Sequence, residues 1–323
     1  MAFPSDPWLW YPCPTRLLMS TTRCYMPLPP LKSSGSPIKR FFSVLKGLLS
    51  AGVLLPLLVG INVLQMMSFV LIKPLSDDLF RRFNRGCAAF WWGLSYKWAG
   101  WYGTEIVVSG DELPPEENAM LVANHQEAPD IPMLFPIAYR AGRIGDLKWF
   151  VKNILKYVPG VGWGMVFLDC IFVKRNWTSD KDYISSIFER IITKKIPVWI
   201  ISFVEGTRIR PKKLERSNEY AEKAGLTPTR HVLLPRTKGF SATVNALRPH
   251  LDAVYDITIG YVDGVPSAAQ WFQGDVKKAY LHVKRYPLET LPTDEEELSQ
   301  WLLDRFYEKD ERLETFYETG EMS

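Results

Sequence analysis

Residues 119–130 of this 323-residue chain read AMLVANHQEAPD, and they indicate both the class of fold and a place for chemistry. An apolar run of five residues ends abruptly at Asn124 and His125, and Asp130 follows shortly afterwards. A short apolar run bounded by turn-forming residues is typical of a buried strand. The sequence therefore predicts a strand over 119–123 that presents polar side chains at its carboxyl end.

The same design recurs along the chain from residue 104 onward. Further β-rich runs lie at 105–110, 171–174, 197–203, 255–262 and 279–284, and helical patterns lie between them at 131–142, 179–195, 212–225 and 237–250. Strands that alternate with helices predict an α/β fold, with a mixed or largely parallel sheet covered by helices. In such sheets, binding sites gather where strands run into loops.

His125 and Asp130 are the first candidates for chemistry. On a regular helix, residues five apart would diverge by about 140°. Pro129 and Pro132 prevent a regular helix here, so a turn could bring the two side chains together. A histidine held by a carboxylate has a fixed tautomer and a stabilised imidazolium, as a general base requires. A plain structural role, in which Asp130 caps the following helix, is the alternative that spacing alone leaves open.

Three further strand ends carry basic or hydroxyl groups. The run at 197–203 leads into Glu205, Gly206, Thr207 and Arg208. Lys174 ends the run at 171–174, and Arg175 follows it. Pro235 and Arg236 follow another apolar stretch. Backbone amides, a hydroxyl and forked guanidinium donors suit phosphate oxygens, and Glu205 could hold Arg208 in place. Each basic pair alone is typical of a solvated surface, so it is their recurrence at successive strand ends that indicates a ligand.

The net charge of +4 conceals an uneven distribution. Residues 292–323 hold 11 acidic and 3 basic residues, so the remaining 291 residues carry a net charge of +12. A basic surplus of this size suggests a partner that bears phosphate: nucleic acid, anionic lipid or a nucleotide. The acidic end predicts a solvated helical surface. The four cysteines show no metal-ligand spacing, which favours reduced thiols.

Residues 47–72 are 26 uncharged and mostly apolar residues between Lys46 and Lys73. At about 1.5 Å per residue, a helix of this length exceeds the roughly 30 Å hydrocarbon core of a bilayer, which predicts one tilted or kinked membrane anchor. A signal peptide and a buried core helix are the alternatives. Residues 1–46 hold six basic residues and one acidic residue, and they predict a basic flexible arm.

Residues 87–103 read CAAFWWGLSYKWAGWYG, and seven of them are aromatic. The stretch is too short and too aromatic for a second clean span. Because indole and phenol rings prefer the headgroup boundary of a bilayer, it predicts an interfacial or re-entrant element. Packing of these rings in a protein core is the alternative.

Four blocks of the chain carry a resemblance to a known family. NHQEAPD (124–130) resembles the NHxxxxD signature of the glycerolipid acyltransferase superfamily, and IFVKRNW, FVEGTR and LLPRTKGF are similar to its second, third and fourth blocks, in the same order. Further likeness over about residues 40–318 indicates the eukaryotic branch that uses acyl-CoA and lysophospholipids. The resemblance implies a glycerol-3-phosphate acyltransferase-like catalytic domain over 104–265, a membrane anchor with an interfacial aromatic segment over 47–103, and an acidic C-terminal extension over 266–323.

The resemblance also implies roles for the residues that match its blocks. His125 would deprotonate the glycerol hydroxyl of a lysophospholipid, which then attacks the acyl-CoA thioester, and Asp130 would orient His125. Glu205, Gly206, Thr207 and Arg208 would bind the acceptor's phosphate with help from Lys174 and Arg175, and Pro235 and Arg236 would shape substrate binding. No metal and no cofactor is implied beyond acyl-CoA as co-substrate. The expected partners are acyl-CoA, a lysophospholipid and the bilayer, and nucleic acid is not expected to be a partner.

Three hypotheses about function follow. The first is acylation of 1-acylglycerol-3-phosphate to phosphatidic acid in phospholipid biosynthesis, at the endoplasmic reticulum or another endomembrane. The second is the same chemistry on lysophosphatidylinositol or lysocardiolipin in acyl-chain remodelling, and the third is an inert membrane protein that binds lipid. Ile131 and Val204 stand where many relatives have an aromatic residue and a proline, and both neighbour the chemical groups, so they bear on the choice of acceptor.

Overall fold

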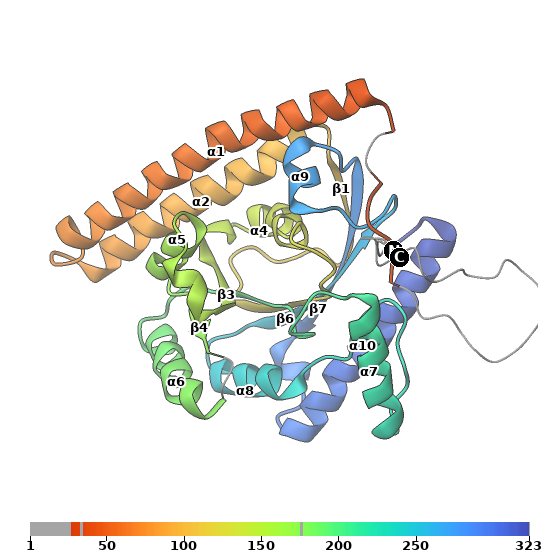
Figure 1. The fold of residues 1–323 in the computed structure, drawn as a ribbon. Coiled ribbons are helices and arrows are strands. Elements are labelled where there is room, and N and C mark those ends of the chain that lie inside the picture. The colour runs from red at the N-terminus through yellow and green to blue at the C-terminus, as the bar shows by residue number, and fades with distance from the viewer. Residues whose placement is uncertain (1–26, 33–34, 175–176, 323) are drawn as a thin grey trace, which may run out of the picture.

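A seven-stranded mixed sheet forms the centre of the protein (Figure 1). The computed structural model describes residues 27–32, 35–174 and 177–322. The strands are β1 (Glu105–Gly110), β2 (Ala119–Ala123), β3 (Leu147–Lys152), β4 (Ile171–Val173), β5 (Trp199–Ser202), β6 (Ala253–Tyr261) and β7 (Lys278–Pro287), arranged in the order β1-β7-β6-β2-β5-β3-β4. Neighbouring strands are parallel, except for the antiparallel pair β6 and β7. The predicted α/β fold with a mixed sheet is confirmed.

Helices cover both faces of the sheet. They are α1 (Pro37–Leu71), α2 (Asp77–Trp101), α3 (Asp130–Met133), α4 (Phe135–Arg140), α5 (Val161–Phe167), α6 (Trp177–Thr193), α7 (Pro211–Lys223), α8 (Thr237–Leu247), α9 (Ala268–Gln273) and α10 (Glu295–Thr319), with 3₁₀ turns η1 (Ile144–Asp146), η2 (Asn153–Tyr157) and η3 (Leu288–Thr290). α1, α2, α4 and α5 lie over one face, and α6, α8 and α10 lie over the other (Figure 1). β2 is buried on both faces, which explains its uninterrupted apolar sequence.

β3, with the sequence LKWFVK, has no counterpart among the predicted strands. Lys148 and Lys152 interrupt its apolar pattern. Lys148 is nevertheless buried, and its Nζ donates a hydrogen bond to the backbone oxygen of Leu168 at 2.7 Å. Because a buried amine is tolerated only where it finds an acceptor, this strand depends on a tertiary contact that the sequence pattern does not show.

The region predicted as an acidic extension completes this same sheet. β7 lies between β1 and β6, and α10 packs on the sheet through an apolar inner face that includes Leu302 and Phe306. The Asp294 side chain caps α10 by accepting hydrogen bonds from the N–H groups of Glu296 and Glu297 at 2.8 and 3.0 Å. The acidic region is helical as predicted, but seven of the 25 residues of α10 are buried in the core.

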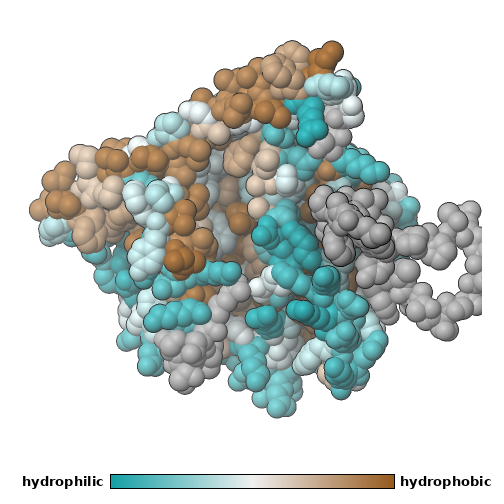
Figure 2. All heavy atoms as spheres, in the orientation of Figure 1, coloured by the Kyte–Doolittle hydropathy of each residue, from teal (hydrophilic) through white to brown (hydrophobic). Residues whose placement is uncertain are grey.

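The faces of α1 are largely reversed with respect to a helix of a water-soluble protein, since its exposed face is apolar and four of its seven buried residues are polar. Its buried residues include Ser50, Asn62, Gln65 and Ser68, whereas apolar side chains cover its outer surface (Figure 2). The Asn84 side chain of α2 donates a hydrogen bond to Ser68 Oγ at 3.0 Å, so the inward polar groups join the two helices. Among the described residues, α1 is the one helix long and apolar enough to cross a membrane.

The predicted flexible arm is wrong over residues 37–46, which form the first turns of α1. Pro37 occupies the first helical position, where a missing N–H costs nothing. Farther upstream, Leu31 N–H donates to the backbone oxygen of Val265 at 2.9 Å, and Val265 N–H donates to that of Pro29 at 2.8 Å. Residues 1–26 and 33–34 of the predicted arm lie outside the described residues.

The aromatic segment 87–103 belongs mostly to α2, a continuous helix of 25 residues. A re-entrant element is therefore wrong. The core-packing alternative holds for Trp91 and Trp92, which are buried, and the Trp92 ring lies 5.3 Å from that of Trp149 in β3. Phe90 and Trp101 instead remain 56% and 69% exposed, on surfaces that water alone would not favour.

The buried ion pair between α10 and β6 gives a test of how the C-terminal region contributes to stability. Lys309 Nζ lies 2.7 Å from Asp256 Oδ1, and both side chains are at most 2% exposed. Removing one partner of a buried pair leaves the other uncompensated, so we expect Lys309→Met to lower the free energy of unfolding by roughly 3–5 kcal/mol. Denaturant unfolding in detergent measures the loss. The double variant Lys309→Met/Asp256→Leu should recover most of it, and a single variant as stable as wild type would contradict this role.

Candidate active site

The loop after β2 brings His125 and Asp130 together. β2 ends at Ala123, and Asn124 fastens the start of the loop to β6. The Asn124 side chain donates a hydrogen bond to the backbone oxygen of Ile259 at 2.9 Å and accepts one from its N–H at 2.8 Å. His125 Nδ1 then lies 2.9 Å from Asp130 Oδ2. The turn expected between these two residues is therefore formed.

Asp130 is fully buried, with donors on both carboxylate oxygens. Oδ2 accepts hydrogen bonds from the N–H groups of Gln126 and Glu127 at 2.6 and 2.8 Å, in addition to its contact with the His125 ring. Oδ1 accepts a hydrogen bond from the Tyr261 hydroxyl at 2.7 Å. Because the carboxylate turns back into the loop, it does not cap the following helix, so the predicted cap is wrong.

The imidazole of His125 is held on its face as well as at its edge. The Phe203 ring stacks on it with centroids 4.1 Å apart and planes at 21°. The His125 side chain is 16% exposed. Because a carboxylate accepts hydrogen bonds and does not donate them, Nδ1 donates to Asp130 and Nε2 keeps its lone pair. Nε2 is therefore the atom placed to take a proton.

Glu205 is buried and engages the backbone. Its Oε1 accepts a hydrogen bond from the N–H of His125 at 2.9 Å, and its Oε2 accepts one from the N–H of Leu233 at 3.3 Å. Burial raises the pKa of Glu205 well above its usual value. Both carboxyl oxygens are therefore occupied inside the protein, and the structure does not place Glu205 for the predicted contact with a phosphate; Oε1 instead supports the backbone of His125.

Glu127 holds the arginine that Glu205 was expected to hold. Its two oxygens pair with Arg208 and Arg210, which makes the expected Glu205–Arg208 contact wrong. Burial alone would raise the pKa of Glu127, but the Ala128 N–H and the two guanidinium groups lower it. The Arg208 side chain remains 48% exposed, so it is fixed in direction and still open to a ligand.

Gly206 and Arg236 lie against each other and join the third and fourth blocks. Gly206 has a φ of +71°, and a Cβ at this position would come 2.8 Å from Arg236 Nε. The Arg236 N–H donates to the backbone oxygen of Val204 at 2.8 Å. Thr207 contacts Lys213 through its hydroxyl. We call Gly206, Thr207, Arg208 and Arg236 the basic cluster, because they gather two guanidinium groups beside the His125 loop.

The remaining predicted binding residues are Lys174, Arg175 and Pro235, and Lys174 lies farther from the His125 loop than the basic cluster does. Lys174 is exposed after β4, and its N–H donates to Asp180 Oδ1 at 3.1 Å. β5 and β3 separate β4 from β2 in the sheet. Arg175 lies outside the described residues. Pro235 directly precedes Arg236 and so belongs to the loop that carries the basic cluster.

Tyr261 and Phe203 complete the site, although neither of them was predicted to take part in it. Tyr261 reaches Asp130 because β6 pairs in parallel with β2, with Ala123 opposite Ile257. Strand order and register decide that contact, and neither follows from residue spacing. Glu127 was the detectable omission, because it is an acidic residue inside the same loop as His125.

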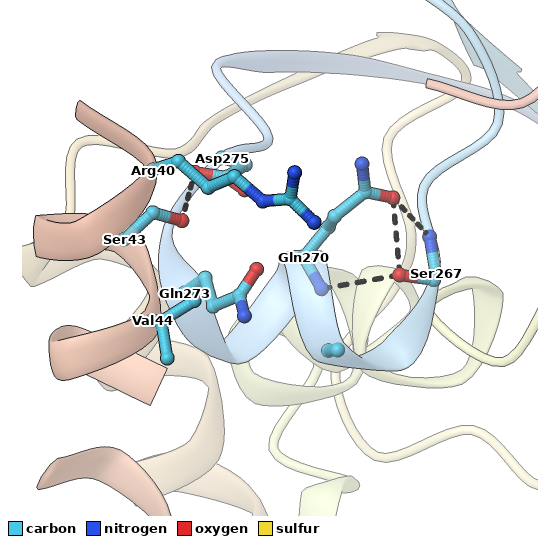
Figure 3. Close-up of a pocket in the computed structure, with 8 residues that line it drawn as sticks. Arg40, Ser43, Val44, Ser267, Gln270, Gln273 and Asp275 are labelled. Carbon is cyan, nitrogen blue, oxygen red and sulfur yellow. Dashed lines mark hydrogen bonds between the residues drawn. The ribbon is translucent and has the colours of Figure 1, made fainter. Parts of the chain in front are cut away.

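A cavity of about 330 Å³ lies elsewhere, between α1 and α9 (Figure 3). Its polar lining includes Arg40 and Gln273, and the Ser43 hydroxyl donates to Asp275 Oδ1 at 2.7 Å. None of its lining residues belongs to the His125 site, so it is not the place of the chemistry. Across residues 27–32, 35–174 and 177–322, no group of three or more His, Cys, Asp and Glu side chains could hold a metal ion.

Similarity to known proteins decides the family. The family model described as Acyltransferase matches residues 105–262, and the one described as Acyltransferase C-terminus matches residues 270–323. 1-acyl-sn-glycerol-3-phosphate acyltransferase 3 of Arabidopsis thaliana is 33% identical over 264 residues, which cover 80% of this chain and 70% of that protein. The chain belongs to the acyltransferase family. The predicted membership of an acyltransferase family is confirmed.

Other relatives of this acyltransferase bear two kinds of name. 1-acyl-sn-glycerol-3-phosphate acyltransferase 2 of Brassica oleracea is 34% identical over 79% of this chain and 67% of its own length. Lysocardiolipin acyltransferase 1 of Gallus gallus is 37% identical over 68% of this chain and 59% of its own length. The fold is similar to that of the 1-acyl-sn-glycerophosphate acyltransferase PlsC from Thermotoga maritima, with a TM-score of 0.50 and 19% identity over 84% of this chain and 96% of that one.

The position of Glu205 predicts how its amide variant behaves. In Glu205→Gln, one backbone N–H would face an amide N–H in place of an oxygen, at a cost of about 1–3 kcal/mol. We expect kcat to fall about tenfold, because the N–H of His125 loses support, while the KM for the lysophospholipid stays within about twofold. Saturation kinetics measure both, and Glu215→Gln, an exposed change on α7, is the control. A raised acceptor KM at unchanged kcat would restore the phosphate-binding role.

Proposed function

We propose that this acyltransferase moves an acyl group from acyl-CoA to the free glycerol hydroxyl of a lysophospholipid, with 1-acylglycerol-3-phosphate as acceptor and phosphatidic acid as product. The observation that carries the proposal is the His125–Asp130 pair, in a chain of the acyltransferase family. The imidazole presents Nε2 and has its other nitrogen committed to a buried carboxylate. The names of the relatives agree on a lysophospholipid as the molecule acylated.

In this mechanism His125 Nε2 takes the proton of the acceptor hydroxyl as its oxygen attacks the thioester carbonyl. The tetrahedral intermediate collapses with cleavage of the carbon–sulfur bond, and the imidazolium returns the proton to the sulfur of CoA. Asp130 stabilises the imidazolium between these two steps. Because the thioester is already activated, no acyl-enzyme is required, and the residues of the site contribute mainly orientation and proton transfer.

The basic cluster is the place we assign to the acceptor's phosphate. Arg208 and Arg236 offer forked donors, which match phosphate oxygens better than a point charge does. Gly206 lets Arg236 approach the backbone, and Glu127 fixes the direction of Arg208. Lys174 is left with a supporting, more distant role, as a charge on the basic surface.

Lysocardiolipin is the second candidate acceptor, with lysophosphatidylinositol as a related one. The observation in its favour is the 37% identity to lysocardiolipin acyltransferase 1 of Gallus gallus, against 34% for the Brassica oleracea relative. Two arginines suit a phosphodiester as well as a terminal phosphate, since both present free oxygens. Acceptor choice is therefore a question for direct competition between substrates.

Membrane attachment follows from the reversed faces of α1. Its outer side chains include Phe41, Leu48, Leu55 and Met67, which are 50–65% exposed and would contact acyl chains in a bilayer. The polar groups that join α1 to α2 are typical of helices that associate in lipid. We assign the protein to a membrane, and among membranes to the endoplasmic reticulum or another endomembrane, where lysophospholipid acceptors are at hand.

Loss of the base tests the mechanism. Purified wild-type protein in liposomes should transfer a labelled acyl group from CoA to at least one member of a panel of lysophosphatidate, lysophosphatidylinositol and lysocardiolipin. His125→Ala should lower kcat by about 10³-fold or more, because proton transfer and the orientation of the attacking oxygen are lost together. His250→Ala, at a histidine outside the site, is the matched control. Equal turnover by wild type and His125→Ala would overturn the mechanism, and an inactive wild type would favour the inert lipid-binding alternative.

Arg208 tests the assignment of the phosphate. A charge-assisted hydrogen bond is worth about 1.5–3 kcal/mol, so Arg208→Ala should raise the KM for the preferred lysophospholipid roughly tenfold or more, with the KM for acyl-CoA little changed. Arg216→Ala removes the same charge from the exposed side of α7 and is the control. A change confined to the KM for acyl-CoA would contradict this assignment and would indicate that the basic cluster binds acyl-CoA instead of the acceptor.

A further inference from the structure

The acidic helix α10 contacts the loop that carries Arg236, and this contact has no assigned purpose. The loop runs from the end of α7 to Arg236, immediately before α8. Near its start, the N–H of Thr227 donates a hydrogen bond to the hydroxyl of Tyr307 in α10 at 3.1 Å. The main contacts lie farther along the loop, at residues 230–232.

Asp310 binds three consecutive backbone N–H groups of this loop. The N–H of Arg230 lies 2.9 and 3.0 Å from the two carboxylate oxygens, that of His231 lies 2.6 Å from Oδ1, and that of Val232 lies 3.2 Å from Oδ1. A carboxylate that accepts successive N–H groups fixes the backbone, because only one conformation directs all of them at it. Asp310 therefore determines the path of the loop before Leu233.

Glu314, one turn farther along α10, holds the side chains of the same loop. Its Oε2 lies 2.8 Å from His231 Nε2, and its Oε1 pairs with the Arg230 guanidinium, which lowers the pKa of Glu314. The ring of Tyr317, on the next turn, packs edge-on against the His231 ring with centroids 5.0 Å apart. Three turns of α10 thus form one continuous face toward the loop.

The loop passes this restraint to the active site by two routes. Immediately after the clamped residues, the N–H of Leu233 binds Glu205, which in turn binds the N–H of His125. Three residues later, Arg236 is tied to Val204 and lies against Gly206 in the basic cluster. Because few residues separate Val232 from Arg236, a shift of the clamped backbone would move the guanidinium.

We propose that Asp310 and Glu314 are positioning residues that hold the 230–236 loop in the shape in which Arg236 meets the acceptor's phosphate. The inference rests on the proposed function, since it assigns the acceptor's phosphate to the basic cluster. It gives the acidic C-terminal helix a role in substrate binding. Of the two routes, the one through Arg236 leads to the acceptor's phosphate, so acceptor binding is the property that should change.

A double-mutant cycle tests this route. In liposomes at saturating acyl-CoA, we expect Asp310→Asn to raise the acceptor KM about tenfold. An amide nitrogen would replace Oδ2 and face the N–H of Arg230, and the remaining oxygen would lack the charge of the carboxylate. Glu311→Gln, an exposed acid-to-amide change at the next position of α10, should leave it unchanged. In the Arg236→Ala background, Asp310→Asn should add less than about twofold, since the group it positions is already gone. Glu314→Gln repeats the cycle if Asp310→Asn does not fold.

The outcomes separate the two proposals. An unchanged acceptor KM in Asp310→Asn, or a tenfold effect that persists in full in the Arg236→Ala background, would overturn the positioning role while leaving the proposed function intact. An equal effect of Glu311→Gln would also overturn it, since the net charge of α10 would then suffice. A wild-type protein without turnover on any acceptor would overturn the proposed function, and this inference with it.

Discussion

The buried carboxylate of Asp130 is the interaction on which the rest of the site depends. A charge without solvent must find donors, and these come from the loop backbone, the His125 ring and the Tyr261 hydroxyl of β6. That requirement places β6 next to β2 in one register and keeps Asn124 tied to Ile259. The geometry of the site therefore depends on the pairing of β6 with β2 in this register.

The proposed membrane attachment would place two parts of this chain in different solvents. The sheet and helices α6, α8 and α10 have the arrangement of a water-soluble protein, with apolar side chains inside and charged side chains outside. α1 has largely the opposite arrangement, since its buried residues include serine, asparagine and glutamine and its outer face is apolar. The hydrogen bond between Asn84 and Ser68 joins α1 to α2 by a contact that keeps its strength where hydrophobic association is weak.

Much of the fold could be predicted from periodicity, and the misses share one cause. Six of the strands and helices α4, α6, α7 and α8 correspond to apolar runs and helical patterns that are local in the sequence, whereas α5 and α9 have no predicted counterpart. β3 was missed because its buried Lys148 is satisfied by Leu168, and α2 was misjudged because Trp91 and Trp92 pack against distant parts of the chain. In the site, His125, Asp130 and Arg208 could be named from their motifs, whereas Tyr261, the role of Glu205 and the partner of Arg208 could not.

The sequence by itself determined the chemistry available: an apolar strand that ends in Asn-His, an aspartate five residues later, arginines after two other strands, and one long uncharged helix. Residue type and local spacing suffice for that, because they set which groups can accept protons, bind anions or enter lipid. Only the tertiary structure decided which groups meet. Glu127 rather than Glu205 holds Arg208, Tyr261 completes the shell of Asp130, and the acidic end of the chain packs against the Arg236 loop. Those contacts join residues far apart in the chain, and strand register and helix packing set them.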